Sequence, residues 1–138
     1  MPDPRLLIGR TVAARFRVTG VLGEGGMAMV SVAEQDEEPR EVALKVMNEE
    51  LTRDRTFVRR FEREAKASSL VVHENSVRIH AWGVSEGLSY IVMELLRGDD
   101  LYVLLERGGP ISQARAARIL TEVCEALEVA HGLGIVHR

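Results

Sequence analysis

The stretch Gly23-Glu24-Gly25-Gly26-Met27-Ala28-Met29-Val30 decides the fold of this chain, because strand patterns stand on both sides of it. Phe16 to Leu22, before the glycines, is rich in β-branched residues, and from Val30 onward apolar residues alternate with smaller ones. A polar segment with a proline, 35–40, precedes Glu41 to Met47, which alternates again. The pattern predicts three antiparallel strands joined by hairpins, with the glycine cluster at the first turn.

Glycine clusters of this kind serve phosphates, because a residue without Cβ lets backbone N–H groups approach the oxygens closely. The spacing Gly23-x-Gly25-x-x-Ala28 also fits a dinucleotide-binding loop, as in an oxidoreductase, or an ordinary hairpin turn. A dinucleotide loop opens a helix, but the residues that follow here alternate as a strand. A Walker A loop ends in Gly-Lys-Ser/Thr, which is absent. A hairpin whose glycine tip folds over a phosphate chain is the interpretation that fits best.

Lys45 is the first candidate catalytic residue. Alternation along 41–47 places Ala43 and Lys45 on one face of the strand and the larger apolar residues on the other. The apolar face is expected in the core. On the other face, the small Ala43 leaves room for a flat ligand beside a cation suited to phosphate.

Glu64 is the second candidate. Residues 52–70 have helical periodicity, with Phe61 and Ala65 on the apolar side between charges on the other. Most of those charges are expected on the solvated face. Glu64 lies near the apolar seam, whereas Glu62, the competing choice, lies on the opposite side. A glutamate facing Lys45 would hold its ammonium through a charge-assisted hydrogen bond.

Two more strands and two more helices are expected. Val77 to Trp82 and Leu88 to Met93 have strand patterns. Asp99 or Asp100 can cap a helix that extends to Glu106, and Ser112 can cap a longer one that runs to about Gly132. The apolar stripe of the longer helix comprises Leu120, Val123, Cys124, Leu127 and Ala130. So apolar a helix needs partners on more than one side, and we expect further chain beyond Arg138 to cover it.

Five stretches, in this order and at this spacing, resemble the bacterial Ser/Thr protein kinases of the eukaryotic-like type. They are Leu22 to Met27 (phosphate loop), Val42 to Lys45 (third-strand lysine), Phe61 to Ala65 (C-helix glutamate), Tyr90 to Gly98 (fifth strand and hinge) and Gly134 to Arg138 (approach to the catalytic loop). The resemblance implies an α+β fold: a kinase small lobe, with a five-stranded antiparallel sheet and the C-helix, then the first helices of the large lobe. The expected bounds are a lead-in at 1–15, the small lobe and hinge at 16–96, and the large lobe from 97 to 138.

The resemblance also implies how ATP would be held. The walls of the adenine site would be Leu22, Val30, Ala43 and Met93, with Met93 as gatekeeper. Backbone groups of Glu94 and Leu96 would bond the adenine edge, and Asp100 would reach the ribose. Lys45, oriented by Glu64, would hold the α- and β-phosphates beneath the loop made by Gly23, Glu24, Gly25, Gly26, Met27 and Ala28.

Three departures from the family pattern affect these expectations. Ala28 stands where a third glycine is usual and adds a Cβ at the loop tip; if that position needs positive φ, the strain is about 1–2 kcal/mol. Glu74 replaces a common proline, which we interpret as a loop detail. The sequence ends at Arg138, where the family's catalytic aspartate should follow, and the asparagine and Asp-Phe-Gly that hold magnesium are likewise absent.

The expected function is therefore the ATP-binding portion of a kinase that transfers the ATP γ-phosphate to protein Ser/Thr hydroxyls, catalytically incomplete by itself. ATP and a protein substrate are the expected partners, with Mg²⁺ required in the complete domain. The alternative is a non-catalytic kinase-like binding or regulatory module. The reading frame beyond Arg138 would distinguish the two.

Composition agrees with a globular protein that binds no nucleic acid. The chain has 46% hydrophobic and 28% charged residues and a net charge of −3, without the basic excess of a nucleic-acid binder. One cysteine, Cys124, allows no internal disulfide and predicts a cytoplasmic location. No signal peptide or membrane-spanning run is apparent. The four histidines lack zinc-protease spacing, so no metal site is expected within the chain.

Overall fold

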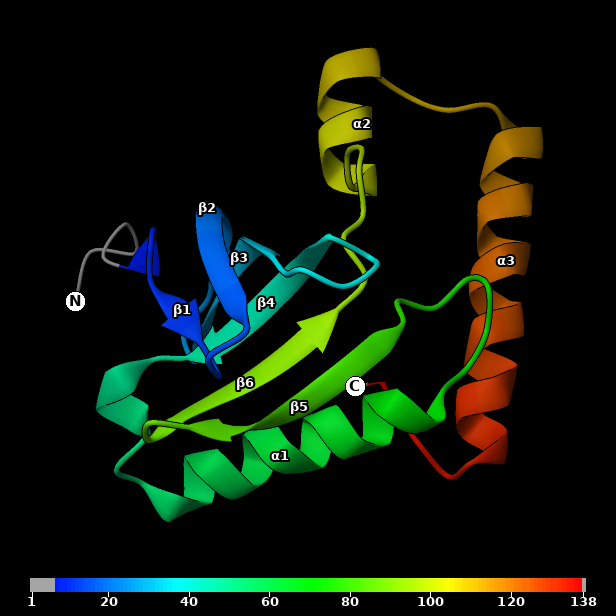
Figure 1. The fold of residues 1–138 in the computed structure, drawn as a ribbon. Coiled ribbons are helices and arrows are strands. Elements are labelled where there is room, and N and C mark those ends of the chain that lie inside the picture. Colours follow the sequence, from blue (N-terminus) through cyan, green and yellow to red (C-terminus); the bar gives the residue numbers. More distant parts are fainter. Residues whose placement is uncertain (1–6, 138) are drawn as a thin grey trace. The chain divides into compact units, whose positions relative to one another are not determined.

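A computed structural model describes residues 7–137, which form two compact units (Figure 1). The first comprises residues 7–69 and 78–95, and the second comprises residues 70–77 and 96–137. Most of the predicted site lies in the first unit. Arg138, the last residue of the stretch that resembles the approach to a catalytic loop, lies outside the described residues, as do residues 1–6 of the predicted lead-in.

The first unit is built on an antiparallel sheet of six strands in the order β1-β2-β3-β4-β6-β5. Its strands are β1 (Thr11–Val12), β2 (Phe16–Glu24), β3 (Ala28–Glu34), β4 (Glu41–Met47), β5 (Ile79–Ser85) and β6 (Leu88–Met93). The predicted antiparallel sheet and its five strands are confirmed, although β2 ends two residues later than expected and β5 is shifted from the predicted 77–82 to 79–85. The structure adds β1, which lies in the predicted lead-in and pairs with β2. A two-residue strand is too short to show alternation, so the sequence pattern could not reveal it.

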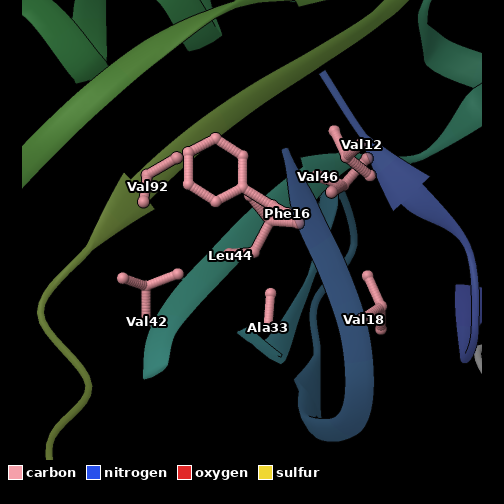
Figure 2. Close-up of a cluster of buried hydrophobic side chains, with 8 residues drawn as sticks. All are labelled: Val12, Phe16, Val18, Ala33, Val42, Leu44, Val46 and Val92. Atoms are coloured by element: carbon pink, nitrogen blue, oxygen red, sulfur yellow. The ribbon is translucent and has the colours of Figure 1, made fainter. Parts of the chain in front are cut away.

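Each face of the sheet carries its own hydrophobic cluster. One cluster, shown in Figure 2, contains Val12, Phe16, Val18, Ala33, Val42, Leu44, Val46 and Val92. The other contains Ala28, Met47, Phe61, Ala65 and Ile91. The strand residues of both clusters follow from alternation, with the odd-numbered residues of β4 on the face that α1 covers through Phe61 and Ala65. The prediction that Val42, Leu44 and Val46 are core is confirmed.

Helix α1 (Arg55–Leu70) begins three residues later than predicted, after the short 3₁₀ helix η2 (Glu49–Leu51). The start is set by Asp54, whose Oδ1 accepts a hydrogen bond from the N–H of Thr56 at 2.8 Å. Phe61 and Ala65 are each 1% exposed and form the apolar seam of the helix, as predicted. This seam fixes which side of α1 meets the sheet and therefore where Glu64 can point.

The second unit contains α2 (Leu101–Gly108) and α3 (Gln113–Gly132), both begun by the predicted kind of cap. Oδ1 of Asp100 accepts a hydrogen bond from the N–H of Val103 at 2.8 Å, and Oγ of Ser112 accepts from that of Arg115 at 3.2 Å. Asp99, the alternative cap, pairs with Arg107 instead. In the predicted apolar stripe of α3, Ala130 is buried, but Leu120 and Val123 are exposed. Between residues 7 and 137, no helix is both long and apolar enough to span a bilayer.

Candidate functional site

The strand register brings the predicted residues of the first unit into two cross-strand rows. Gly23 on β2 is opposite Val30 on β3, which is opposite Lys45 on β4. Two residues along β4, on the same face as Lys45, Ala43 is opposite Met93 on β6. Neighbouring strands lie about 4.8 Å apart, so the backbones of Gly23 and Lys45 are separated by roughly 10 Å. That span suits a lysine side chain and a phosphate group between them.

Lys45 and Glu64 form an ion pair. Nζ of Lys45 donates a hydrogen bond to Oε1 of Glu64 at 2.7 Å, with 26% of the Lys45 side chain and 49% of the Glu64 side chain exposed. Nζ also lies 5.8 Å from the centroid of the Phe61 ring, within the range of a cation–π interaction. Phe61 and Glu64 are one turn apart on the same face of α1. Glu62 is exposed, and no ion pair involves it within the described residues.

The glycine hairpin is closed by a hydrogen bond from the N–H of Gly25 to the carbonyl of Ala28, at 2.9 Å. A Cβ added at Gly23 or Gly26 would meet no other atom within 4 Å, and neither residue has a φ in the left-handed region. Neither packing nor backbone conformation within the chain therefore requires glycine at these two positions. Close approach of a ligand to the loop is a constraint that would require it.

Ala28 does not lie at the loop tip, so that expectation is wrong. It is the first residue of β3, pairs with Met47, and is 5% exposed in the cluster that contains Phe61. Its φ is not positive, because the strand has already resumed at this position. The conditional strain of 1–2 kcal/mol therefore does not arise, and the methyl group contributes to the core.

The predicted adenine walls come from four strands. Leu22 is 52% exposed and lies at a β-bulge, since Val21 pairs with Ser31 and Gly23 already pairs with Val30. Val30 and Met93 are half-buried, and Ala43 is 5% exposed. The bulge twists the end of β2 and turns Leu22 out of the regular alternation.

The predicted hinge residues divide between the two units. The N–H of Glu94 donates to the carbonyl of Arg78 at 2.8 Å within the first unit, so it cannot also serve an adenine edge. Only the backbone carbonyl of Glu94 is therefore available for the predicted hydrogen bond to the adenine edge. Leu96 and Asp100 belong to the second unit, where Asp100 caps α2.

One residue beside the loop escaped sequence reasoning. Asn48 directly follows β4, and its Nδ2 lies 3.3 Å from the carbonyl oxygen of Gly26 and 3.5 Å from that of Gly25. The only sequence signal was its place at the end of the strand that is paired beside the glycine hairpin. Between residues 7 and 137, no group of three His, Cys, Asp or Glu side chains is arranged to hold a metal ion.

Residues 16–138 match the protein kinase domain family. The chain is 41% identical to the serine/threonine-protein kinase pkn3 of Myxococcus xanthus, over 99% of this chain and 25% of that protein. It is 38% identical to PrkC of Bacillus subtilis, over 96% of this chain and 20% of that protein. The crystal structure of the Mycobacterium tuberculosis PknI kinase domain is similar at a TM-score of 0.76 and 30% identity, covering 94% of this chain and 53% of that one. The chain thus spans a quarter or less of these curated relatives and about half of that solved domain.

Proposed function

This chain belongs to the protein kinase family, and on that premise we propose that it forms the ATP-binding part of a serine/threonine kinase. The observation that carries the proposal is the ion pair between Lys45 and Glu64, at 2.7 Å, in the cross-strand row that begins at Gly23. A cation held at that point would neutralise phosphate oxygens beneath the glycine hairpin. The relatives described above are named as serine/threonine kinases, which supports the same substrate class here.

The residues present fit ATP. Gly23 and Gly26 leave open space where a Cβ would project, as a closely approaching phosphate chain requires. Lys45 is partly exposed, so its ammonium can donate to the α- and β-phosphates while Glu64 restrains its position. The paired Ala43 and Met93, with Val30, offer an apolar wall for a flat base. When bound, ATP would supply the γ-phosphoryl group, and Mg²⁺ would neutralise the charge of its phosphates.

The proposal places the general base and the protein ligands of magnesium outside this chain. The support is coverage: the chain spans about half of a solved kinase domain. In the proposed division of work, this chain binds and orients ATP, and further residues activate the Ser or Thr hydroxyl of the protein substrate. We also propose a cytoplasmic location, since Cys124 is free and exposed.

Calorimetric titration of ATP and of adenosine into the purified chain tests the proposal. Lys45→Met removes the charge but keeps a side chain of similar length. Loss of a charge-assisted hydrogen bond, about 1.5–3 kcal/mol, predicts roughly 10- to 100-fold weaker ATP binding with adenosine binding unchanged. The control is Lys66→Met, because Lys66 is the chain's other lysine and is exposed on α1. Absence of ATP binding, or equal ATP affinity for the Lys45→Met variant, would refute the proposal.

A further inference from the structure

Asn48 occupies the N-cap position of η2, where asparagine is a favoured residue. An N-cap asparagine normally accepts a hydrogen bond from an N–H of the first turn. The side chain of Asn48 makes no such bond. Helix capping therefore does not account for where this carboxamide points.

The carboxamide is directed at the glycine hairpin instead. Nδ2 of Asn48 is shared between the carbonyl oxygens of Gly26 and Gly25, at 3.3 Å and 3.5 Å. The backbone N–H of Asn48 donates to the next carbonyl, that of Met27, at 2.9 Å. One residue thus contacts three consecutive carbonyls of the loop, and the short backbone bond fixes the residue that carries the two longer side-chain bonds.

These contacts determine the direction of two N–H groups. In a trans peptide the C=O and the N–H of the same unit point in opposite directions. The units that join Gly25, Gly26 and Met27 contain no proline, and such peptide units are trans. Because both carbonyls point toward Asn48, the N–H groups of Gly26 and Met27 point away from it, on the same side. Successive N–H groups with a common direction form an anion-binding concavity.

The alternation of β4 indicates which side that is. Lys45 and Met47 share one face of the strand, and Val46 lies on the other. Asn48 follows Met47 with an extended backbone, so its side chain is expected on the same face as Val46. Asn48 and the two carbonyls would therefore be on the side opposite Lys45. The two N–H groups would then face the Lys45 side. Gly25 and Gly26 are intrinsically mobile because they lack Cβ, so an external restraint has an effect here.

We propose that Asn48 is a positioning residue that preorganises the N–H groups of Gly26 and Met27 toward the phosphates of ATP. The inference rests on the proposed function of the same site. It deepens that function by assigning the orientation of the loop to a side chain outside the glycine cluster.

The test compares ATP and adenosine titrations of Asn48→Ala and Asn48→Asp. Asp is as good an N-cap as Asn and has the same size, but it donates no hydrogen bond to a carbonyl. Loss of two weak neutral hydrogen bonds predicts that Asn48→Ala binds ATP about fivefold more weakly, and the added negative charge of Asn48→Asp should weaken ATP binding further. Adenosine, which has no phosphate, should bind both variants as it binds the unsubstituted chain. Asn48→Gln, which retains the carboxamide, should recover part of the ATP affinity.

The matched control is Asn75→Ala. Asn75 is the chain's other asparagine, and its Nδ2 donates to the carbonyl of Glu122 at 3.0 Å within the second unit. Its removal should leave the ratio of ATP to adenosine affinity unchanged. An unchanged ATP affinity in Asn48→Ala, or an equal loss of ATP and adenosine binding, would overturn the role of Asn48. If Lys45→Met also leaves ATP binding unchanged, the proposed function fails as well.

Discussion

A double-mutant cycle on Lys45 and Glu64 should reveal a coupling of about 0.2–1 kcal/mol in the free energy of unfolding. The perturbations are Lys45→Met, Glu64→Gln and their combination. The estimate follows from the exposure of the pair: the Glu64 side chain is 49% exposed and the Lys45 side chain 26%, so water screens the attraction across the 2.7 Å contact. A fully buried pair would instead lose several kcal/mol when one partner is removed.

Urea denaturation of the four proteins supplies the four free energies. The matched control is the cycle of Lys45→Met with Glu62→Gln. Glu62 lies on the same helix two residues before Glu64, is exposed, and forms no ion pair within the described residues. That control cycle should give a coupling near zero. The Lys45 and Glu64 coupling should also shrink as ionic strength rises to about 1 M, where the screening length is roughly 3 Å.

Two results would contradict this reasoning. A coupling above about 2 kcal/mol would mean that the pair is desolvated and structural rather than screened. A coupling that Glu62→Gln reproduces would mean that the attraction is the general field of the helix, not the contact to Glu64. In either case the ion pair between Lys45 and Glu64 would no longer support the proposed phosphate site, in which Glu64 serves to orient Lys45 and contributes little to stability.

Three further changes test the packing that supports the site. Phe61→Ala should lower the free energy of unfolding by about 3–5 kcal/mol, because the ring is 1% exposed; Phe61→Leu should lose less, and thermal melting distinguishes them. Ser31→Ala should raise the free energy of unfolding by about 1 kcal/mol, because Oγ of Ser31 is buried without a hydrogen-bond partner among the described residues; an unchanged denaturation midpoint would contradict this. Ser112→Ala should lower the free energy of unfolding by about 0.5–2 kcal/mol through loss of the α3 cap, with Ser68→Ala, inside α1 and outside any cap, as the reference in circular dichroism melts.

Much of the first unit could be predicted because its strands alternate clearly. The alternation of β4 is sufficient by itself to assign Leu44 to the core and Lys45 to the opposite face. Strand β1 could not be predicted, since two residues contain no period and their pairing with β2 is a tertiary contact. The late start of α1 depended on Asp54, whose capping bond is one of several that the polar segment before the helix could have made.

The site was less predictable than the sheet. Proximity of Lys45 and Glu64 followed from the helical seam, because Glu64 lies one turn beyond Phe61 and next to Ala65, the two residues that α1 buries against the sheet. The position of Ala28 did not, since a glycine-spacing pattern does not state where the hairpin ends and β3 begins. Asn48 was missed because its contacts depend on where the carbonyls of Gly25 and Gly26 lie, and the glycine spacing does not state the shape of the hairpin.

The magnitudes indicate what holds α1 against the sheet. Truncation of Phe61 to alanine should cost about 3–5 kcal/mol, several times the 0.2–1 kcal/mol expected of the exposed ion pair one turn away. The core contact therefore sets the position of the helix, and the pair with Glu64 adds direction to the ammonium of Lys45 at little cost in stability. Because that attraction is weak, a phosphate could share the ammonium without displacing α1. Phe61 thus links the stability of the unit to the proposed site, since its ring packs in the core and also lies 5.8 Å from Nζ of Lys45.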